Sequence, residues 1–212
     1  MEKALREEIS AYGRLVYAQG LTSGTSGNLS ARLDANHILV TASGCHKGML
    51  AEKDVLLYDL QSGKVISKTP CSPSSEIRMH ACVYQHRPEI GAVIHAHPPY
   101  LVALSVANLS LQEVVLPEAV LALGAVVDCG YATPTTEDVV QAMKPYVQEG
   151  HTSFALARHG SVTIGKDMNE AFCRLETLEH VAKVTAIASA IDHVTFLPQQ
   201  EVEKLKKIFG KN

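Results

Sequence analysis

The sequence predicts an α/β protein in which helices pack on a mixed, largely antiparallel sheet. Two pairs of short strand-like segments are each separated by turn residues, as in hairpins: residues 28–32 with 38–41, and 55–58 with 64–66. Further along, strand-like segments alternate with segments of helical periodicity, which is typical of helices layered on a sheet. The chain has 212 residues and no repeat or linker, so we expect one domain over residues 1–212.

The first half of the chain contains two helix signals. Apolar residues recur at helical spacing over residues 4–19, and the pattern stops at Gly20. A second helix is expected to begin with Ser74 or Ser75 as its cap. It should end before Pro88, because the residue preceding a proline avoids the helical conformation.

Strand and helix signals alternate in the second half. An apolar strand is expected over residues 92–97, followed by a short helix after Pro98. Asp167 and Glu170 have the spacing of a capping box with an acidic cap, which predicts a long helix to about Ala190. The other expected elements are strands over residues 125–128 and 153–157 and helices over residues 137–148 and 199–209.

The composition is that of a folded protein and gives no reason to expect nucleic acid or a membrane as a partner. Hydrophobic residues make up 46% of the chain and charged residues 19%, and the formal net charge is -3. Apolar runs such as residues 186–191 are too short to span a bilayer, and the N-terminus lacks a signal-peptide pattern. The 5 cysteines include no CxxC pair, so we expect reduced thiols in a cytoplasmic protein.

Three histidines and a glutamate are candidate metal ligands. His95 and His97 are two positions apart in a predicted strand, so their rings point to the same face, about 7 Å apart, and can reach one cation. His159 is the best third ligand, because it ends another apolar strand and precedes Gly160, where the chain can turn. Glu76, at the start of a predicted helix, is the natural fourth ligand.

Each of these residues also has a simpler explanation. A single histidine is more often a surface or hydrogen-bonded residue, and Glu76 alone could be an acidic first-turn residue favoured by the helix dipole. The combination favours a metal, because polar rings in an apolar strand are costly to bury without partners. The simpler explanation is kept for six other histidines: His46, His80, His86, His151, His180 and His193.

Three loops are rich in glycine and small hydroxyl residues: residues 24–28, 41–44 and 72–75. Such loops can offer backbone N–H groups and hydroxyls to a phosphate, and the third precedes a helix N-terminus, which attracts anions. They can also simply form turns. Neither GxxxxGK[ST] nor GxGxxG occurs, so nucleotide binding is not indicated. Together the loops favour a phosphate cradle beside the metal.

In this order, the motifs resemble those of the class II aldolase and adducin family. The resemblance extends from about residue 5 to residue 191. It rests on GTSGNLS at residues 24–30, TASG at 41–44, SSE at 74–76, HAHP at 95–98 and RHG at 158–160. Singly these motifs are weak, but together they are specific.

The resemblance implies a set of roles and an architecture. His95, His97 and His159 would bind Zn2+, with Mn2+ or Co2+ also acceptable to such a site, and Glu76 would be both a ligand and the catalytic acid/base. Related enzymes form a three-layer α/β/α domain and assemble as homotetramers with active sites between subunits. The residues implied to hold the substrate phosphate are Gly27, Asn28, Ser43, Gly44, Ser74 and Ser75.

The same resemblance implies the reaction. Family aldolases have Glu at the position of Glu76, whereas the 4-epimerases usually have Asp. We therefore expect reversible cleavage of a ketose 1-phosphate, such as L-fuculose 1-phosphate or a deoxyribulose 1-phosphate, to dihydroxyacetone phosphate and a small aldehyde. The alternatives are a sugar-phosphate 4-epimerase, a methylthioribulose-1-phosphate dehydratase, and a non-catalytic interaction module as in the adducins.

One position departs from the family pattern. Fuculose-phosphate aldolases have a tyrosine that protonates the departing aldehyde oxygen, and Leu121 aligns with it here. Glu118 and Tyr131 are the residues expected to replace it. Lysine Schiff-base chemistry has little support, because the only lysine near the polar loops, Lys47, lies beside Gly48 rather than inside an apolar strand.

Overall fold

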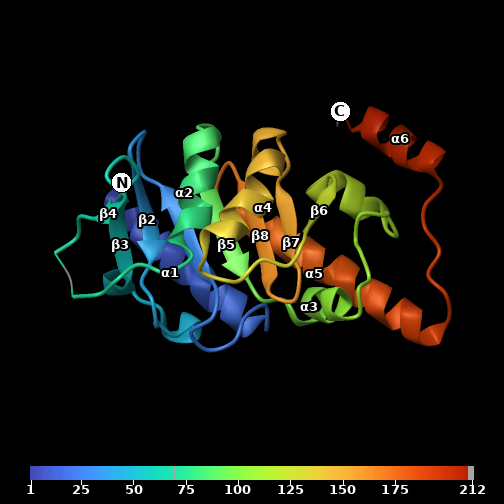
Figure 1. The fold of residues 1–212 in the computed structure, drawn as a ribbon, viewed down its shortest axis with the longest axis horizontal. Coiled ribbons are helices and arrows are strands. Elements are labelled where there is room, and N and C mark those ends of the chain that lie inside the picture. Colours follow the sequence, from blue (N-terminus) through green and yellow to red (C-terminus); the bar gives the residue numbers. More distant parts are fainter. Residues whose placement is uncertain (69, 210–212) are drawn as a thin grey trace.

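The computed structural model describes residues 1–68 and 70–209, so the last residues of the predicted domain, 210–212, lie outside the described part. Its centre is an eight-stranded sheet in the order β4-β3-β2-β1-β5-β8-β7-β6 (Figure 1). The β6–β7 pair is parallel and the other pairs are antiparallel, which confirms the predicted sheet. The strands are β1 (Asn28–Arg32), β2 (His37–Thr41), β3 (Val55–Asp59), β4 (Lys64–Val65), β5 (Ala92–Ala96), β6 (Val126–Cys129), β7 (Ser153–Leu156) and β8 (Gly160–Gly165).

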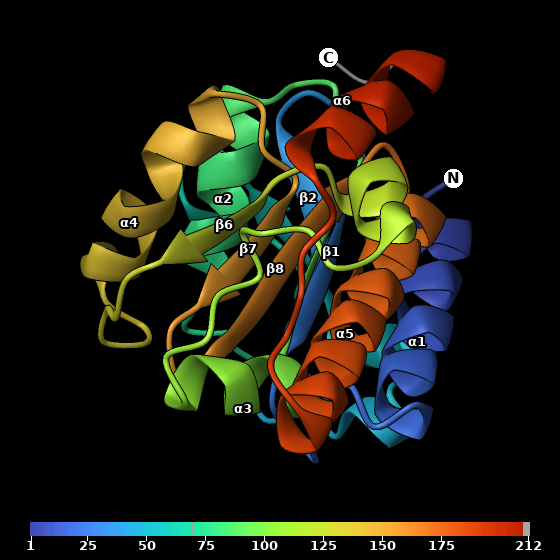
Figure 2. The same cartoon turned by 90° about the vertical axis from the view of Figure 1, so that its right-hand side faces the viewer.

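Helices cover both faces of this sheet, as Figure 2 shows. On one face α2 and α4 pack beside each other, and on the other α5 packs between α1 and α3. The three-layer α/β/α architecture is therefore confirmed. The helices are α1 (Glu2–Ala18), α2 (Ile77–His86), α3 (Pro99–Val106), α4 (Glu137–Gln148), α5 (Met168–Ile191) and α6 (Gln199–Ile208).

Strand β5 shows how the sequence divides its side chains between the two layers. Val93 belongs to the core under α2 and α4, whereas Ile94 belongs to the core under α1 and α5. Because strand side chains alternate, His95 lies on the α2 side, in line with Val93. The face that carries His95 is therefore the face where α2 begins.

Strand β8 was not predicted, although it lies at the centre of the sheet between β5 and β7. Its sequence alternates in the way a strand requires: Val162 and Ile164 face one core, and Thr163 faces α5, where its Oγ1 donates to the Ala171 carbonyl at 2.9 Å. Glycines at both ends and hydroxyl residues between them weakened the signal. The sequence patterns therefore gave no element between residue 157 and Asp167, where the structure has this strand.

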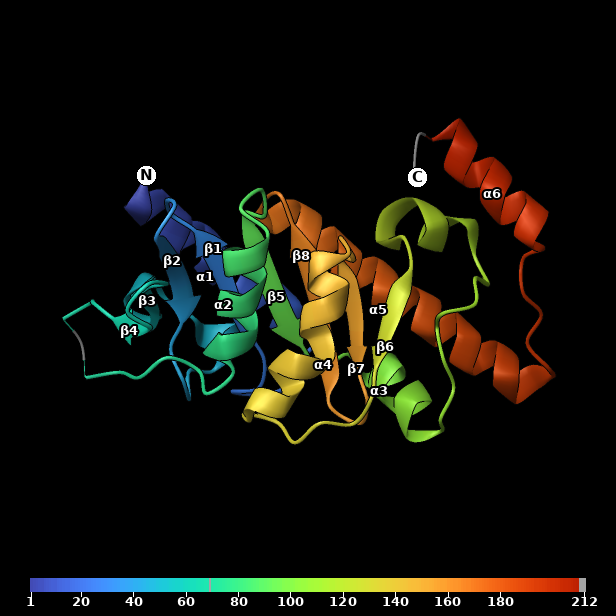
Figure 3. The ribbon, with the colours of Figure 1, turned by 45° about the horizontal axis from the view of Figure 1, so that its top comes forward.

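Two helix ends and one short helix need comment. The cap of α5 is confirmed, because the Asp167 carboxylate accepts from the Glu170 N–H at 2.8 Å. Helix α2 instead begins one or two residues later than predicted, with Glu76 rather than Ser74 or Ser75 at its N-cap. A π-helical turn at Ala119–Leu123, absent from the prediction, packs against α6 at the end of the molecule far from β4 (Figure 3).

The described helices include none long and apolar enough to cross a membrane.

Candidate active site

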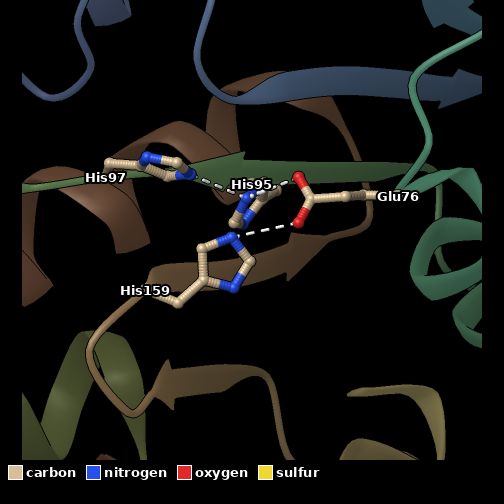
Figure 4. Close-up of side chains that lie close together, drawn as sticks. All are labelled: Glu76, His95, His97 and His159. Atoms are coloured by element: carbon tan, nitrogen blue, oxygen red, sulfur yellow. Dashed lines mark hydrogen bonds and ion pairs between the residues drawn. The ribbon is translucent and has the colours of Figure 1, made fainter. Parts of the chain in front are cut away.

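Four side chains from three separate parts of the chain meet on the α2 side of the sheet (Figure 4). Glu76 is the N-cap of α2, His95 lies in β5, His97 follows that strand directly, and His159 lies in the turn between β7 and β8. One nitrogen or oxygen from each side chain can be chosen so that all four atoms lie within 4.8 Å of one another. The structure thus brings together the four residues named as metal ligands.

The hydrogen bonds of His95 determine which of its nitrogens faces the cluster. Its Nδ1–H donates to the Ser161 carbonyl at 2.8 Å, so in the neutral ring the Nε2 lone pair is free. This Nε2 atom lies 2.9 Å from a Glu76 carboxylate oxygen and 3.0 Å from Nε2 of His97. Two imidazole nitrogens and a carboxylate oxygen therefore converge, an arrangement that can bind a cation.

His159 completes the group from a tight turn. Its Nε2 atom lies 3.0 Å from the other carboxylate oxygen of Glu76, and its buried Nδ1 has no hydrogen-bond partner in the described part of the chain. The sharp turn is not at Gly160, as predicted, but two residues earlier, where Arg158 has a left-handed φ of 57°. Gly160 is needed for a different reason, because an added Cβ would come 2.3 Å from the Ala96 carbonyl oxygen.

Burial and neighbouring charges hold these groups in the states that bind metals. Burial lowers the pKa of His97 to about 4, with His95 and His159 adding to the effect, so the ring is neutral at neutral pH. Burial alone would raise the pKa of Glu76, but the imidazoles of His159 and His95 bring it well below its usual value. A carboxylate with three imidazole side chains is a donor set that suits a divalent cation such as Zn2+.

Asn28 connects the cluster to a buried hydrogen-bond network that the sequence analysis did not foresee. Its amide donates to the Glu76 carboxylate at 3.2 Å and to Ser74 Oγ at 2.9 Å. Its carbonyl oxygen accepts from Nε2–H of His80, and Nδ1 of His80 accepts from Ser30 Oγ at 2.6 Å. Each donor in this series of hydrogen bonds therefore has an acceptor. The Asn28 side chain is thereby fixed with its NH2 group towards Glu76.

His80 is the key member of this network. It is fully buried, and burial lowers its pKa to about 3, with a smaller contribution from His95. The ring is therefore neutral and can donate from one nitrogen while accepting at the other. The simpler explanation, a surface or hydrogen-bonded histidine, holds in its second form, because the buried ring is hydrogen-bonded to Asn28 and Ser30. The spacing of four positions after Glu76 was the available signal, because residues i and i+4 lie on the same face of a helix.

The three polar loops come together beside the cluster. Ser43 N–H donates to the Ser72 carbonyl at 2.9 Å, and Ser74 is held by Asn28 as described. Gly27 has a φ of 74°, and a Cβ there would lie 2.7 Å from the His95 carbonyl oxygen, so only glycine lets this loop pass so close to β5. The first and third loops thus contact Glu76 through Asn28 and Ser74, and the second loop is bonded to the third through Ser43 and Ser72.

A comparison with protein families accounts for this arrangement. The model of the class II aldolase and adducin N-terminal domain matches residues 7–186. The chain belongs to the class II aldolase and adducin family. The resemblance on which the sequence analysis relied is therefore confirmed, and with it an enzyme of the aldolase or lyase kind.

Several relatives of this class II aldolase family member carry different activities in their names. L-fuculose phosphate aldolase of Methanococcus maripaludis is 33% identical over 82% of this chain and 91% of its own length. 5-Deoxy-D-ribulose 1-phosphate aldolase of Bacillus thuringiensis is 31% identical over 96% of this chain and 94% of its own. 3-Oxo-tetronate 4-phosphate decarboxylase of Haemophilus influenzae is 31% identical over 96% of both chains.

A solved structure of L-fuculose 1-phosphate aldolase has the same fold. It superposes with a TM-score of 0.87 at 29% identity and covers 98% of this chain and 96% of its own. Class II aldolases are metal-dependent, and the Glu76 and histidine cluster is a group that could bind a metal ion. The metal dependence of the family therefore agrees with the presence of this cluster in the structure.

In the described part of the chain, neither residue proposed as a general acid forms a hydrogen bond or an ion pair with this cluster. The Glu118 carboxylate is 3.6 Å from Nε2 of His180 on α5, and Tyr131, just after β6, is 67% exposed. Leu121, which aligns with the family tyrosine, lies in the π-helical turn. Among the described residues, no tyrosine and no second carboxylate is therefore bonded to the cluster, and the role of Glu118 or Tyr131 stays a prediction.

Proposed function

We propose that this protein is a zinc-dependent class II aldolase that reversibly cleaves a ketose 1-phosphate to dihydroxyacetone phosphate and a small aldehyde. The observation that supports it most is the convergence of Nε2 of His95, Nε2 of His97 and the Glu76 carboxylate, with His159 beside them. L-fuculose 1-phosphate and a deoxyribulose 1-phosphate are the favoured substrates, in keeping with the names of two relatives.

In this proposal His95, His97, His159 and Glu76 hold the metal in the resting enzyme. A bound Zn2+ would act as a Lewis acid that stabilises negative charge on the substrate oxygens in the transition state. Mn2+ and Co2+ have similar ligand preferences and could replace it. The complete set of ligands argues against the non-catalytic role of an adducin-like module.

Glu76 moves the proton that the reaction requires. In cleavage the C3–C4 bond breaks, its electron pair stays on C3, the C4 hydroxyl loses its proton, and Glu76 delivers a proton to C3. In condensation Glu76 removes that proton from dihydroxyacetone phosphate. A positioned acid/base of this kind contributes about 10²–10⁴-fold in rate. The amide of Asn28, 3.2 Å from the carboxylate, keeps Glu76 in place.

The substrate phosphate binds in the loops beside Glu76 and orients the bond that breaks. We assign this contact to six residues of the polar loops: Gly27, Asn28, Ser43, Gly44, Ser74 and Ser75. Their support is the set of hydrogen bonds that joins the loops, from Asn28 to Ser74 and from Ser43 to Ser72.

The acid that serves the aldehyde oxygen comes from a neighbouring subunit in our proposal. Glu118 and Tyr131 are the two candidates, and in the isolated chain Tyr131 is exposed and Glu118 partly exposed. This requires a homotetramer with active sites at subunit interfaces. A cytoplasmic location agrees with the free thiols of Cys45, Cys82, Cys129 and Cys173.

A second candidate reaction is decarboxylation of a 3-oxo-tetronate 4-phosphate. In that reaction the C1–C2 bond breaks, CO2 leaves, the electron pair stays on C2, and protonation of C2 gives dihydroxyacetone phosphate. No hydroxyl proton has to be removed, so no acid/base is needed beyond Glu76. The lack of a second acid in the single-chain site favours this alternative, as does the relative that matches 96% of both chains.

One set of incubations tests these proposals. Zinc-loaded protein is mixed with dihydroxyacetone phosphate and a panel of small aldehydes, and the sugar phosphates formed are identified. Aldolase activity joins two fragments, an epimerase interconverts two isomers, and a dehydratase releases water. A parallel incubation with 3-oxo-tetronate 4-phosphate is monitored for CO2. Release of CO2 without any carbon–carbon bond formation would replace the aldolase by the decarboxylase.

A further inference from the structure

Lys47 is buried beside the polar loops. It begins a short 3-10 turn, Lys47–Met49, just after the loop at residues 41–44. Only 1% of its surface is exposed, and by residue volume it ranks first among the fully buried side chains of the described residues. Its place in the sequence, beside Gly48 and outside any apolar strand, did not indicate this burial, which therefore requires an explanation.

The ammonium group of Lys47 is held by two loops. Nζ donates to the Cys45 carbonyl at 2.9 Å and to the Thr25 carbonyl at 3.1 Å, and the backbone N–H of Lys47 donates to the Gly24 carbonyl at 2.9 Å. Thr25 lies in the first polar loop, and Cys45 directly follows Gly44 of the second. The charge therefore lies where the two loops meet.

This positive charge has no anionic partner in the protein. Within the described ranges 1–68 and 70–209, no carboxylate lies within ion-pair distance of Lys47, whereas Lys3, Lys204 and Lys206 pair at the surface. Two carbonyls satisfy two of the three N–H donors of an ammonium. A buried charge without a counter-ion is costly, so such a lysine is typical of a site whose anion arrives with a ligand.

We propose that Lys47 supplies the positive charge that retains the phosphate group of the substrate. This inference rests on the proposed function, because it takes the phosphate of that sugar as the ligand. The loops by themselves offer N–H groups and hydroxyls, which are neutral donors, whereas a phosphate carries about two negative charges. The Lys47 ammonium is bonded to the carbonyls of Thr25 and Cys45 and adds a fixed positive charge to these neutral phosphate-binding groups.

A purely structural lysine would behave differently. If Lys47 only ties the loops together, removing it would weaken every ligand of the site, phosphorylated or not, in parallel with the loss of stability. If it is the counter-ion, its removal would weaken phosphate-containing ligands selectively. The comparison of phosphorylated with unphosphorylated ligands therefore separates the two roles.

The test uses full-length, zinc-loaded protein and inorganic phosphate as the probe. Phosphate affinity is measured by calorimetry for wild type, for Lys47→Met and for Lys53→Met, an exposed lysine with the same change of charge. We expect Lys47→Met to lose affinity about 10-fold or more, as for a near charge pair in a partly screened site, and Lys53→Met to stay within about 2-fold. An unchanged affinity in Lys47→Met overturns the proposal.

Two further measurements keep the outcome decisive. The KM for a ketose 1-phosphate should rise in Lys47→Met while the activity with the unphosphorylated ketose changes little, and an equal loss on both would indicate a structural lysine. If Lys47→Met does not fold, Lys47→Arg is used instead. It keeps the charge, so phosphate affinity should stay within about 3-fold, and a 10-fold loss would refute the counter-ion role.

The result is independent of the reaction type. Phosphate binding involves no turnover, so a Lys47-dependent affinity without cleavage of any ketose 1-phosphate would remove the aldolase proposal and leave this one. Cleavage of a ketose 1-phosphate together with normal phosphate affinity in Lys47→Met would remove the Lys47 proposal and leave the aldolase proposal.

Discussion

The side-chain amide of Asn28 donates to the Glu76 carboxylate at 3.2 Å, across 48 positions of the chain. The same side chain bonds Ser74 on one side and His80 on the other. The start of β1 is thereby tied to the start of α2, so the proposed acid/base Glu76, the polar-loop residue Ser74 and a buried imidazole share one hydrogen-bond partner. The predictions below depend on this network and on the strand that faces it.

Replacing Asn28 by alanine should impair catalysis more than folding. Asn28→Ala removes a hydrogen bond to a charged group and leaves His80 Nε2–H unpaired. Such bonds correspond to about 1.5–3 kcal/mol, so kcat/KM for the cleaved sugar phosphate should fall about 10–100-fold. Steady-state kinetics at equal zinc content measure this. The exposed Asn169→Ala is the control, and wild-type kinetics in Asn28→Ala would contradict the role.

Neutralising Glu76 should separate metal binding from turnover. Glu76→Gln keeps an oxygen ligand in nearly the same place but has no titrating carboxylate. We expect zinc to remain at least partly bound while kcat falls about 10²–10⁴-fold. Elemental analysis and kcat are measured on the same sample, with the exposed Glu149→Gln as the matched control. Full activity in Glu76→Gln would remove this residue from the mechanism.

The buried His80 should make stability depend on pH. Its pKa is about 3 in the folded protein and about 6.5 when unfolded, so between these values the unfolded state binds more protons. Wild-type stability should therefore fall as the pH drops below about 6.5. Relative to the non-titrating His80→Gln, wild type should lose about 2 kcal/mol between pH 7 and pH 5.

The measurement is urea unfolding of wild type and His80→Gln at each pH. A chelator removes any bound metal from both samples, so that the other histidines of the site contribute equally to the two proteins. His80→Gln will itself be less stable at pH 7, because Ser30 loses its acceptor. The informative quantity is the change in the difference between the two proteins. A difference that stays constant from pH 7 to pH 5 would mean that His80 is not held neutral.

Adding one methyl group at Gly160 should disturb the metal site. A Cβ at this position would lie 2.3 Å from the Ala96 carbonyl oxygen and 2.8 Å from Cδ2 of His97. In Gly160→Ala, β5 and β8 must shift apart beside His97 and His159, two of the proposed metal ligands. We expect about 1–3 kcal/mol lower stability and zinc affinity reduced about 10-fold or more. Gly130→Ala, with nothing within 4 Å, is the control.

Zinc affinity for these two glycine variants is measured by competition with a coloured chelator, and stability by urea unfolding. Equal affinity in Gly160→Ala and wild type would show that β8 can adjust without moving His97. The control variant should match wild type in both measurements.

Local patterns predicted most elements but missed the strand at the centre of the sheet. The hairpin β1–β2 and the helix capped by Asp167 follow from signals within a few residues of each other. Strand β8 is bounded by Gly160 and Gly165, and its pairing partner β5 lies more than sixty positions earlier in the chain. One side of β8 pairs locally with β7 across the turn, but the other side pairs with β5, and a local pattern cannot register that non-local contact.

The same distinction applies to the candidate site. The HxH spacing and the family motifs indicated four metal ligands, and the structure brings those side chains to within 4.8 Å. Their role as ligands stays a prediction, as do the single-domain range and the phosphate contacts. The sequence did not indicate that Glu118 pairs with His180, nor that Lys47 is buried, because exposure depends on how loops pack together.

By itself, the sequence determined the α/β class, the family, and which residue types are available for chemistry, since these follow from periodicity and from motifs that each occupy a few adjacent positions. Only the tertiary structure decided which nitrogen of His95 faces the cluster, how Asn28 is oriented through His80, and that the Lys47 charge is buried between two loops. The physical reason is that hydrogen bonds and burial join residues from distant parts of the chain, whose meeting no local pattern encodes.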